Sequence, residues 1–241
     1  MPKFVELWVY LSATPLFGLT ATLVVYVLAQ AAYARLQQAP WANPVLWTVI
    51  VLAGMLLATR VDYPTYFAGA QFIHFLLGPA VVALAWPLWE RRAELRERWR
   101  LLLVAALLGG TAASGSALAL GWMVGLPNDV VLSLAPKSVT APVAMGIADK
   151  IGGIPALAAV FAVITGLVGA LSGKYLFSAL KIPITSSGWM ARGFALGTAS
   201  HGLGAARALQ VNADAGAYAG LALGLQVVLA SLLIPLVFRW L

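Results

Sequence analysis

Apolar residues run through this chain in long blocks that short polar segments separate. Five blocks are continuous, over residues 7–34, 43–58, 101–124, 154–171 and 215–237. Three more are apolar but carry glycine, proline or polar residues in their middle, over residues 63–89, 127–151 and 188–209. A membrane-spanning helix needs about 20 mostly apolar residues. The pattern therefore predicts an all-α integral membrane protein of about seven or eight membrane segments.

The three interrupted blocks are expected to form broken or re-entrant helices rather than straight rods. Proline removes a helical hydrogen bond and glycine loosens the turn. Open backbone at membrane depth is tolerated only where protein or a water-filled cavity satisfies it, so the breaks are the segments best suited to a binding site. The backbone positions that we assign to the breaks are Gly78, Pro79, Pro136, Pro142, Gly197 and Gly202.

Composition supports the membrane assignment. Of 241 residues, 62% are apolar and only 10% are charged, and the mean hydropathy is +0.92. A soluble domain carries charge on about a quarter of its residues, so this chain could not cover its surface with polar groups. The net charge of +7 does not point to nucleic acid, because five of the fifteen basic residues lie in residues 91–100. A short basic loop between apolar blocks is typical of the cytoplasmic side, which predicts a multi-pass protein of the inner (plasma) membrane.

The two halves of the chain resemble each other. A shift of 119 residues aligns residues 68–85 with residues 187–204 and brings one interrupted block onto another. We therefore expect a single transmembrane domain, residues 1–241, with internal repeats at about 5–124 and 127–240.

The basic residues indicate how these halves are oriented. If residues 91–100, residues 174–181 and Arg239 are cytoplasmic, and if residues 127–151 re-enter rather than cross, the two repeats are inverted. Paired broken segments in two inverted halves are typical of a transporter whose binding site lies at the bilayer midplane.

The polar side chains of the second and third breaks are candidates for that site. Potential cations on broken helices favour an anionic ligand, and the N-termini of half-helices add a positive dipole and free N–H donors for a carboxylate. Each cation also has a purely structural interpretation: Lys137 could reach the interface, His201 could be a satisfied core histidine, and Arg207 could anchor a helix end. The candidate substrate-binding residues are Lys137, Ser138, Thr140, Thr198, Ser200, His201 and Arg207.

Other chemistries have little support in the sequence. The chain has no cysteine and two histidines, so we expect neither a metal site nor a bound cofactor. It has no Gly-x-Ser-x-Gly elbow and no carboxylate next to His201, so we do not expect an enzyme. Proton coupling through His201 and sodium coupling through opened carbonyls both stay open.

Several motifs resemble those of the LrgB/CidB family. The first resembling stretch is Phe75–Leu88, the second is Pro136–Ile147 with Gly152–Leu157, and the third is Ala191–Gly193 and Leu196–Gly202 followed by Ala205–Leu209. The resemblance extends over nearly the whole chain, from about residue 5 to residue 240. Trp86 and Ala148-Asp149 depart from the family pattern, at positions that concern packing more than the site.

The resemblance implies two alternative functions. One is a secondary transporter or exporter of small monocarboxylates of the glycolate, glycerate, pyruvate and acetate class, as in the similar part of a plant chloroplast glycolate/glycerate translocator. The other is a holin/antiholin-like protein that modulates murein hydrolase activity and autolysis. We favour transport, because a pore has no evident use for buried Lys137 and His201. The resemblance also implies a small LrgA/CidA-like membrane partner, and we expect a homo-oligomer.

Overall fold

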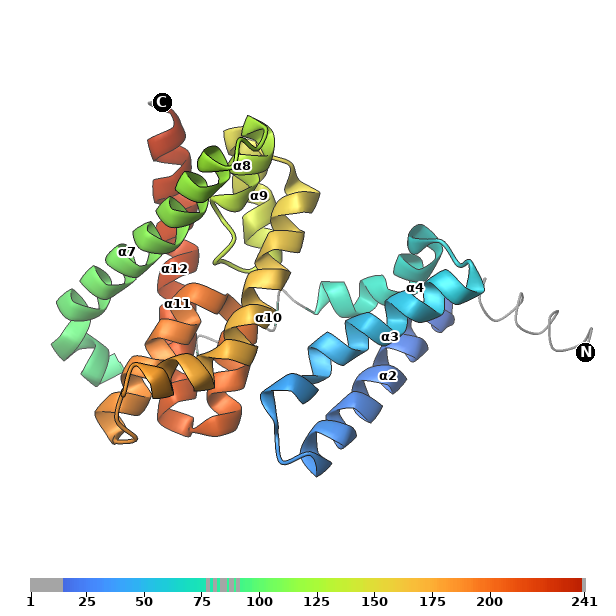
Figure 1. The fold of residues 1–241 in the computed structure, drawn as a ribbon, viewed down its shortest axis with the longest axis horizontal. Helices are drawn as coiled ribbons and strands as arrows, with labels where there is room; N and C mark the ends of the chain where they lie inside the picture. Colours follow the sequence, from blue (N-terminus) through green and yellow to red (C-terminus); the bar gives the residue numbers. More distant parts are fainter. Residues whose placement is uncertain are drawn as a thin grey trace, which may run out of the picture. The chain divides into compact units, whose positions relative to one another are not determined.

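A computed structural model describes residues 15–76, positions 79, 82, 86 and 89, and residues 92–239. Within these residues the secondary structure is helical throughout, with no strand. The chain divides into two units, Met1–Ala83 and Leu84–Leu241, which Figure 1 draws together and which we describe separately. The expectation of an all-α protein is therefore confirmed for the described residues.

In residues 15–76 of the first unit, three long helices pack together. α2 (Pro15–Arg35) lies against α3 (Pro44–Thr59) and α4 (Tyr63–Phe75), with a short 3-10 helix, η1 (Pro40–Ala42), before α3. The side-chain oxygen of Asn43 accepts hydrogen bonds from Val45 N at 2.9 Å and Leu46 N at 3.2 Å, which caps α3. The Thr22 and Tyr66 hydroxyls lie 2.7 Å apart and join α2 to α4.

Over residues 92–239, the described helices of the second unit are α7 (Arg92–Met123), α8 (Asn128–Leu134), α9 (Ala141–Ile151), α10 (Pro155–Ala179), α11 (Ser186–Val211) and α12 (Ala213–Arg239). The sequence predicted a basic loop at residues 91–100, and this prediction is wrong for residues 92–100, which belong to α7. They extend the helix by more than two turns, because no proline or glycine lies between Arg92 and Leu108 to end it.

Among the described residues, four helices are long and apolar enough to cross a membrane. They comprise Leu16–Arg35, Arg96–Met123, Pro155–Ala179 and Ala213–Arg239, and α3 is a shorter apolar helix. An integral membrane protein is thereby supported. The larger number of seven or eight membrane segments is not confirmed and stays a prediction.

The segment that contains α8 and α9 turns back on itself. Ile154 N donates a hydrogen bond to Ser133 Oγ at 2.7 Å, so the end of α8 lies beside the start of α10. A side chain on Gly153 would come within 3.0 Å of Ser133 N, which confirms how closely the two ends meet. Residues 128–154 therefore form a hairpin, the first hairpin, with its tip at residues 136–140.

α11 is not one straight helix, because it consists of two helical arms that meet at a kink. Its backbone leaves the helical region at Ser200 and His201. A side chain on Gly204 would lie 2.6 Å from the carbonyl oxygen of Leu196, whereas residues eight apart in a straight helix are separated by about 12 Å. Gly193 on the first arm contacts Ala215 of α12, and Leu209 on the second arm contacts Gly216 of α12, so both arms reach the same end of α12. We call residues 186–211 the second hairpin.

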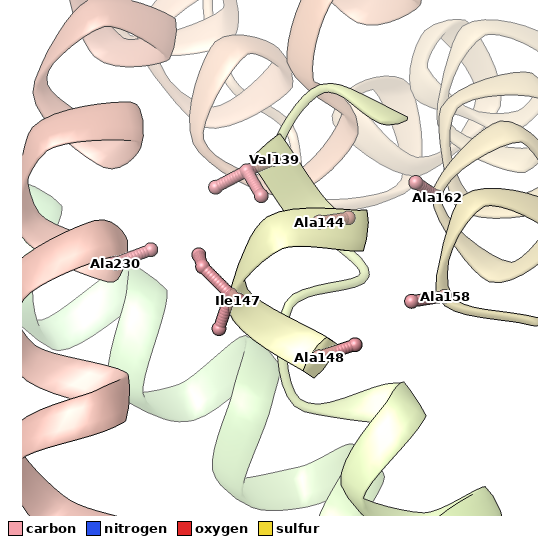
Figure 2. Packing of buried hydrophobic residues seen from close by; sticks show 7 residues of the cluster. All are labelled: Val139, Ala144, Ile147, Ala148, Ala158, Ala162 and Ala230. Carbon is pink, nitrogen blue, oxygen red and sulfur yellow. The ribbon is translucent and has the colours of Figure 1, made fainter. Parts of the chain in front are cut away.

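α10 and α12 run in opposite directions past both hairpins. Along α10, Ala158 and Ala162 pack in one cluster with the first hairpin, and Gly169 and Gly173 then face the second. Along α12, Ala219 faces the second hairpin and Ala230 then packs on the first. Figure 2 shows α9 between these helices, with Val139 and Ile147 pointing toward Ala230 and with Ala144 and Ala148 facing α10.

Within the second unit, a hairpin followed by a long helix occurs twice. The first hairpin is followed by α10 and the second by α12, and these two long helices run in opposite directions. α7 and α12, which the 119-residue shift brings into correspondence, instead run the same way. Leu102 and Ala106 pack with Tyr218 and Ala222, and Ala106 accepts a hydrogen bond from Gln226 farther along α12. Arg239 therefore lies at the end of the unit opposite Arg100. Inverted repeats at 5–124 and 127–240 are not confirmed.

Candidate functional site

The tip of the second hairpin is built by Ser200 and His201. Ser200 has φ −128° and ψ 17°, and His201 has φ 41° and ψ −135°. A positive φ at a residue other than glycine costs about 1–3 kcal/mol, so it persists only where the surrounding structure holds it. Both side chains are buried, with 2% and 5% of their surface exposed. The predicted interruption of this helix is therefore present, and it falls on two of the candidate residues.

A hydrogen bond to α10 holds the imidazole. His201 Nε2 lies 2.7 Å from the carbonyl oxygen of Ala162. A carbonyl only accepts, so Nε2 carries the hydrogen and donates it. The ring approaches α10 where Gly166 has no side chain, since a Cβ there would come within 2.8 Å of Nε2.

Two hydroxyls flank the same tip. Ser200 Oγ occupies the space beside Gly169 of α10, where an added Cβ would overlap it. Thr198 is 5% exposed and places its methyl group 2.8 Å from where a Cβ of Gly109 on α7 would lie. Within the described residues, Thr198 Oγ1 is buried without a hydrogen-bond partner. A buried hydroxyl of this kind is costly and calls for an explanation.

The tip of the first hairpin carries Lys137, Ser138 and Thr140. Ser138 is 5% exposed, Lys137 and Thr140 are half-buried, and Lys137 Nζ lies 3.5 Å from Ser138 Oγ. Pro136, before them, is fully buried. Thr140 is the N-cap of α9 but makes no side-chain capping bond, so N–H groups of the first turn of α9 are left without a cap at the tip.

The two tips approach the same turn of α10. Ala144, in the first turn of α9 directly after the first tip, faces α10 in the buried cluster that contains Ala162, and the Ala162 carbonyl binds His201 of the second tip (Figure 2). On the opposite side, Ser114 Oγ of α7 donates to the carbonyl of Ala135 at 2.7 Å, one residue before Pro136. Residues from the two breaks, far apart in the sequence, are thus brought to neighbouring places in the second unit.

The remaining predicted positions are one substrate-binding candidate, Arg207, and the glycines and prolines assigned to the breaks. Arg207 is buried, 8% exposed, on the returning arm of α11. Gly197 packs against Ala219 of α12, Gly202 has open space around it, and Pro142 is exposed. Pro79 is exposed, and Gly78 lies outside the described residues.

Sequence reasoning missed Gln226. Its side chain is 4% exposed, and Nε2 donates to the carbonyl of Ala106 on α7 at 2.6 Å. The amide sits beside Gly110, where a Cβ would come within 2.6 Å of it. It also lines a cavity of about 240 Å³ between α7 and α12, together with Thr111 and Ser114. The sequence feature that could have indicated Gln226 is its position as a single amide within the apolar block 215–237.

The charge of this region is one-sided. Among the described residues, the buried side chains that can carry a positive charge are Arg192, His201 and Arg207, and Arg192 donates to the Ile182 carbonyl and stacks on the Trp189 ring. The described residues also contain no group of three His, Asp or Glu side chains that could hold a metal ion. Hydroxyls, cationic groups and uncapped helix N–H groups suit a small anion.

These features define an all-helical membrane protein with two broken-helix hairpins. The family model of the LrgB-like family matches residues 22–240, and the chain belongs to that family. The resemblance found in the sequence motifs is thereby confirmed.

The relatives of this chain include uncharacterized proteins and holin-like proteins. The chain is 36% identical over 198 residues to the uncharacterized protein YxaC of Bacillus subtilis, covering 82% of this chain and 84% of that protein. It is 34% identical over 197 residues to an uncharacterized protein of Haemophilus influenzae, covering 82% and 84%. It is 29% identical over 225 residues to the holin-like protein CidB of Staphylococcus aureus, covering 89% and 91%. No solved structure matches the chain.

Proposed function

We propose that this protein is a secondary transporter of small monocarboxylates, of the glycolate, glycerate, pyruvate and acetate class. The observation that carries the proposal is the approach of two opposed hairpin tips to one turn of α10, with Lys137 and Ser138 on one tip and Ser200 and His201 on the other. Discontinuous helices that meet between long spanning helices are the usual framework of a transport site.

Helix register supports a position near the middle of the bilayer. Gln226 is the middle residue of the 27 residues of α12, and Gly109 and Gly110 are the middle pair of the span Arg96–Met123. Gln226 contacts Gly110, and Gly109 contacts Thr198 near the second tip. Since α12 is about 40 Å long, its middle lies about 20 Å from either end, at the depth of the hydrocarbon core.

The buried charges support an anionic substrate. A cation held at membrane depth costs several kcal/mol unless an anion or a polar network compensates it, and half-buried Lys137 Nζ lies beside a neutral hydroxyl, that of Ser138. Lys137 Nζ, the Ser138 and Ser200 hydroxyls and the unpartnered Thr198 hydroxyl would bind the carboxylate and any hydroxyl or keto group. Thr140, His201 and Arg207 would complete the site.

Related expectations belong to the same proposal. We infer that the protein resides in the inner (plasma) membrane, forms a homo-oligomer and works beside a small LrgA/CidA-like membrane subunit. Proton and sodium coupling stay open, and an imposed gradient of each ion across proteoliposomes would distinguish them.

The test is uptake of radiolabelled glycolate, glycerate, pyruvate and acetate into proteoliposomes. We expect saturable uptake by the wild-type protein and at least a tenfold loss in Lys137→Ala and Ser138→Ala. Lys150→Ala removes an exposed lysine of the same hairpin and should leave uptake unchanged. No uptake of any of the four acids, or an equal loss in Lys150→Ala, would refute the carboxylate site.

A holin/antiholin-like role is the second candidate, and the names of the relatives favour it. Several relatives carry the name holin-like protein CidB, in Staphylococcus aureus and Staphylococcus epidermidis. A holin-like protein should release a large entrapped dye from the same vesicles, in a manner that does not depend on Lys137. Dye release without saturable carboxylate uptake would establish this alternative over transport.

A further inference from the structure

The basic residues that begin α7 form an ordered surface outside the proposed transport site. The continuous apolar sequence of this helix starts at Leu101, and residues 92–100 continue the same helix outward. Arg92, Arg96 and Arg100 are exposed and recur every four residues, so they follow one helix face. Trp99, which is 54% exposed, lies on that face between Arg96 and Arg100. We call these four residues the basic stripe.

Along the stripe, like charges four residues apart on a helix repel each other, and Glu97, three residues before Arg100, offsets only part of this repulsion. Arg92 donates to the carbonyl of Trp89 at 2.9 Å and lies 4.8 Å from the centre of the Trp89 ring. Arg100 lies 5.4 Å from the centre of the Trp99 ring. These contacts orient the guanidinium groups but supply no anion.

The stripe begins at the polar layer of the bilayer and extends beyond it. Beyond the hydrocarbon core, headgroups occupy about 5–7 Å on each side. At about 1.5 Å of rise per residue from Leu101, Arg100 and Trp99 lie at the boundary, Arg96 about 7 Å out and Arg92 about 13 Å out. Tryptophan is enriched at this interface because its ring is amphipathic. Arg100 and Arg96 therefore lie at the depth of the lipid phosphates, and Arg92 lies about 6 Å beyond them, within reach of the surface potential of an anionic leaflet.

We propose that the basic stripe binds the phosphate groups of anionic phospholipids in the adjoining leaflet. The planar guanidinium group donates two parallel hydrogen bonds to a phosphate, and clustered arginines next to a spanning helix attract anionic lipid. Because the stripe is a helix and not a flexible loop, its three guanidinium groups are held in a fixed row. This inference does not depend on whether the protein transports carboxylates.

The test is native mass spectrometry of the full chain in detergent micelles, titrated with phosphatidylglycerol or with phosphatidylcholine of the same acyl chains. The stripe variant is Arg92→Gln/Arg96→Gln/Arg100→Gln. The matched control is Arg98→Gln/Lys150→Gln/Lys174→Gln, which removes three exposed charges that lie off the stripe. One basic residue near an anionic surface changes affinity by about fivefold, so the stripe variant should bind phosphatidylglycerol about a hundredfold more weakly.

We expect wild type and control to bind phosphatidylglycerol well above phosphatidylcholine, and the stripe variant to lose this preference. Because the three arginines are exposed, the variant should remain folded, which circular dichroism and size-exclusion chromatography check. An equal loss in the control would overturn the proposal, since net charge alone would then explain binding. Displacement of the lipid by inorganic phosphate at equal concentration would also overturn it, because the site would then recognise a free anion.

Discussion

At the scale of single residues, His201 combines a strained backbone with a side chain that is held in place. Glycine adopts its φ of 41° without penalty, although glycine also costs more entropy on folding. We therefore expect His201→Gly to be more stable than His201→Ala by about 1 kcal/mol, while both lose carboxylate uptake because neither has the imidazole. Thermal unfolding of the two variants in detergent measures the difference. Equal or higher stability of His201→Ala would show that the backbone is not strained.

Thr198 allows stability and function to be separated. Its buried hydroxyl has no partner among the described residues, so Thr198→Val should be as stable as wild type or more stable by about 1–3 kcal/mol. If the hydroxyl binds substrate, uptake should nevertheless fall. Ser133→Ala is the matched control of opposite sign, because Ser133 Oγ accepts from Ile154 N and donates to the Asp129 carbonyl, both at 2.7 Å. That loss should cost about 1–3 kcal/mol by thermal unfolding. A Thr198→Val variant destabilised to the same degree would contradict the assignment.

At the scale of elements, individual glycines of α11 and α12 differ in how closely they approach the neighbouring helix. A Cβ on Gly197 would overlap the carbonyl oxygen of Ala219, whereas one on Gly220 would meet nothing within 4 Å. We expect Gly197→Ala to lose about 1–3 kcal/mol and Gly220→Ala to be neutral or to gain up to about 1 kcal/mol. Unfolding midpoints of the two variants give the comparison. Equal losses would mean that both glycines lie in the contact.

The interruptions could be predicted from the sequence, but the direction of the chain after them could not. Proline and glycine around Lys137 and His201 show that a helix must open, and the backbone opens there. That each segment folds back depends on contacts with distant residues, such as Ser133 with Ile154 and Ser200 beside Gly169. The loop predicted at residues 91–100 was wrong because charge bias reports the side of the membrane, whereas alanine, glutamate and arginine favour helix.

At the scale of the whole molecule, a weak internal resemblance was not enough to define the symmetry. Glycine and leucine are abundant in every membrane helix, so alignments between halves carry little information about direction. The candidate site residues, in contrast, could be selected from the sequence. The polar residues of the two breaks are rare in such helices, which is why Lys137, Ser138, Ser200 and His201 could be selected. Gln226 escaped selection because one amide in an apolar block has no accompanying motif.

The topology of the hairpins can be tested across a real membrane, because the chain has no cysteine to replace. Asp129, Lys150, Ser187 and Ala213 are exposed and lie at the bases of the two hairpins. The measurement uses single variants Asp129→Cys, Lys150→Cys, Ser187→Cys and Ala213→Cys in intact cells and in inverted vesicles, labelled with a membrane-impermeant maleimide.

If both hairpins re-enter, Asp129→Cys and Lys150→Cys are labelled from one side, and Ser187→Cys and Ala213→Cys are both labelled from the other. The reason is geometric: α10 is 25 residues long, about 37 Å, and separates the base of one hairpin from the base of the next. A first segment that crosses the membrane would instead place positions 129 and 150 on opposite sides, and a crossing α11 would do the same for positions 187 and 213. Either result would remove the opposed tips from which the transport site is built.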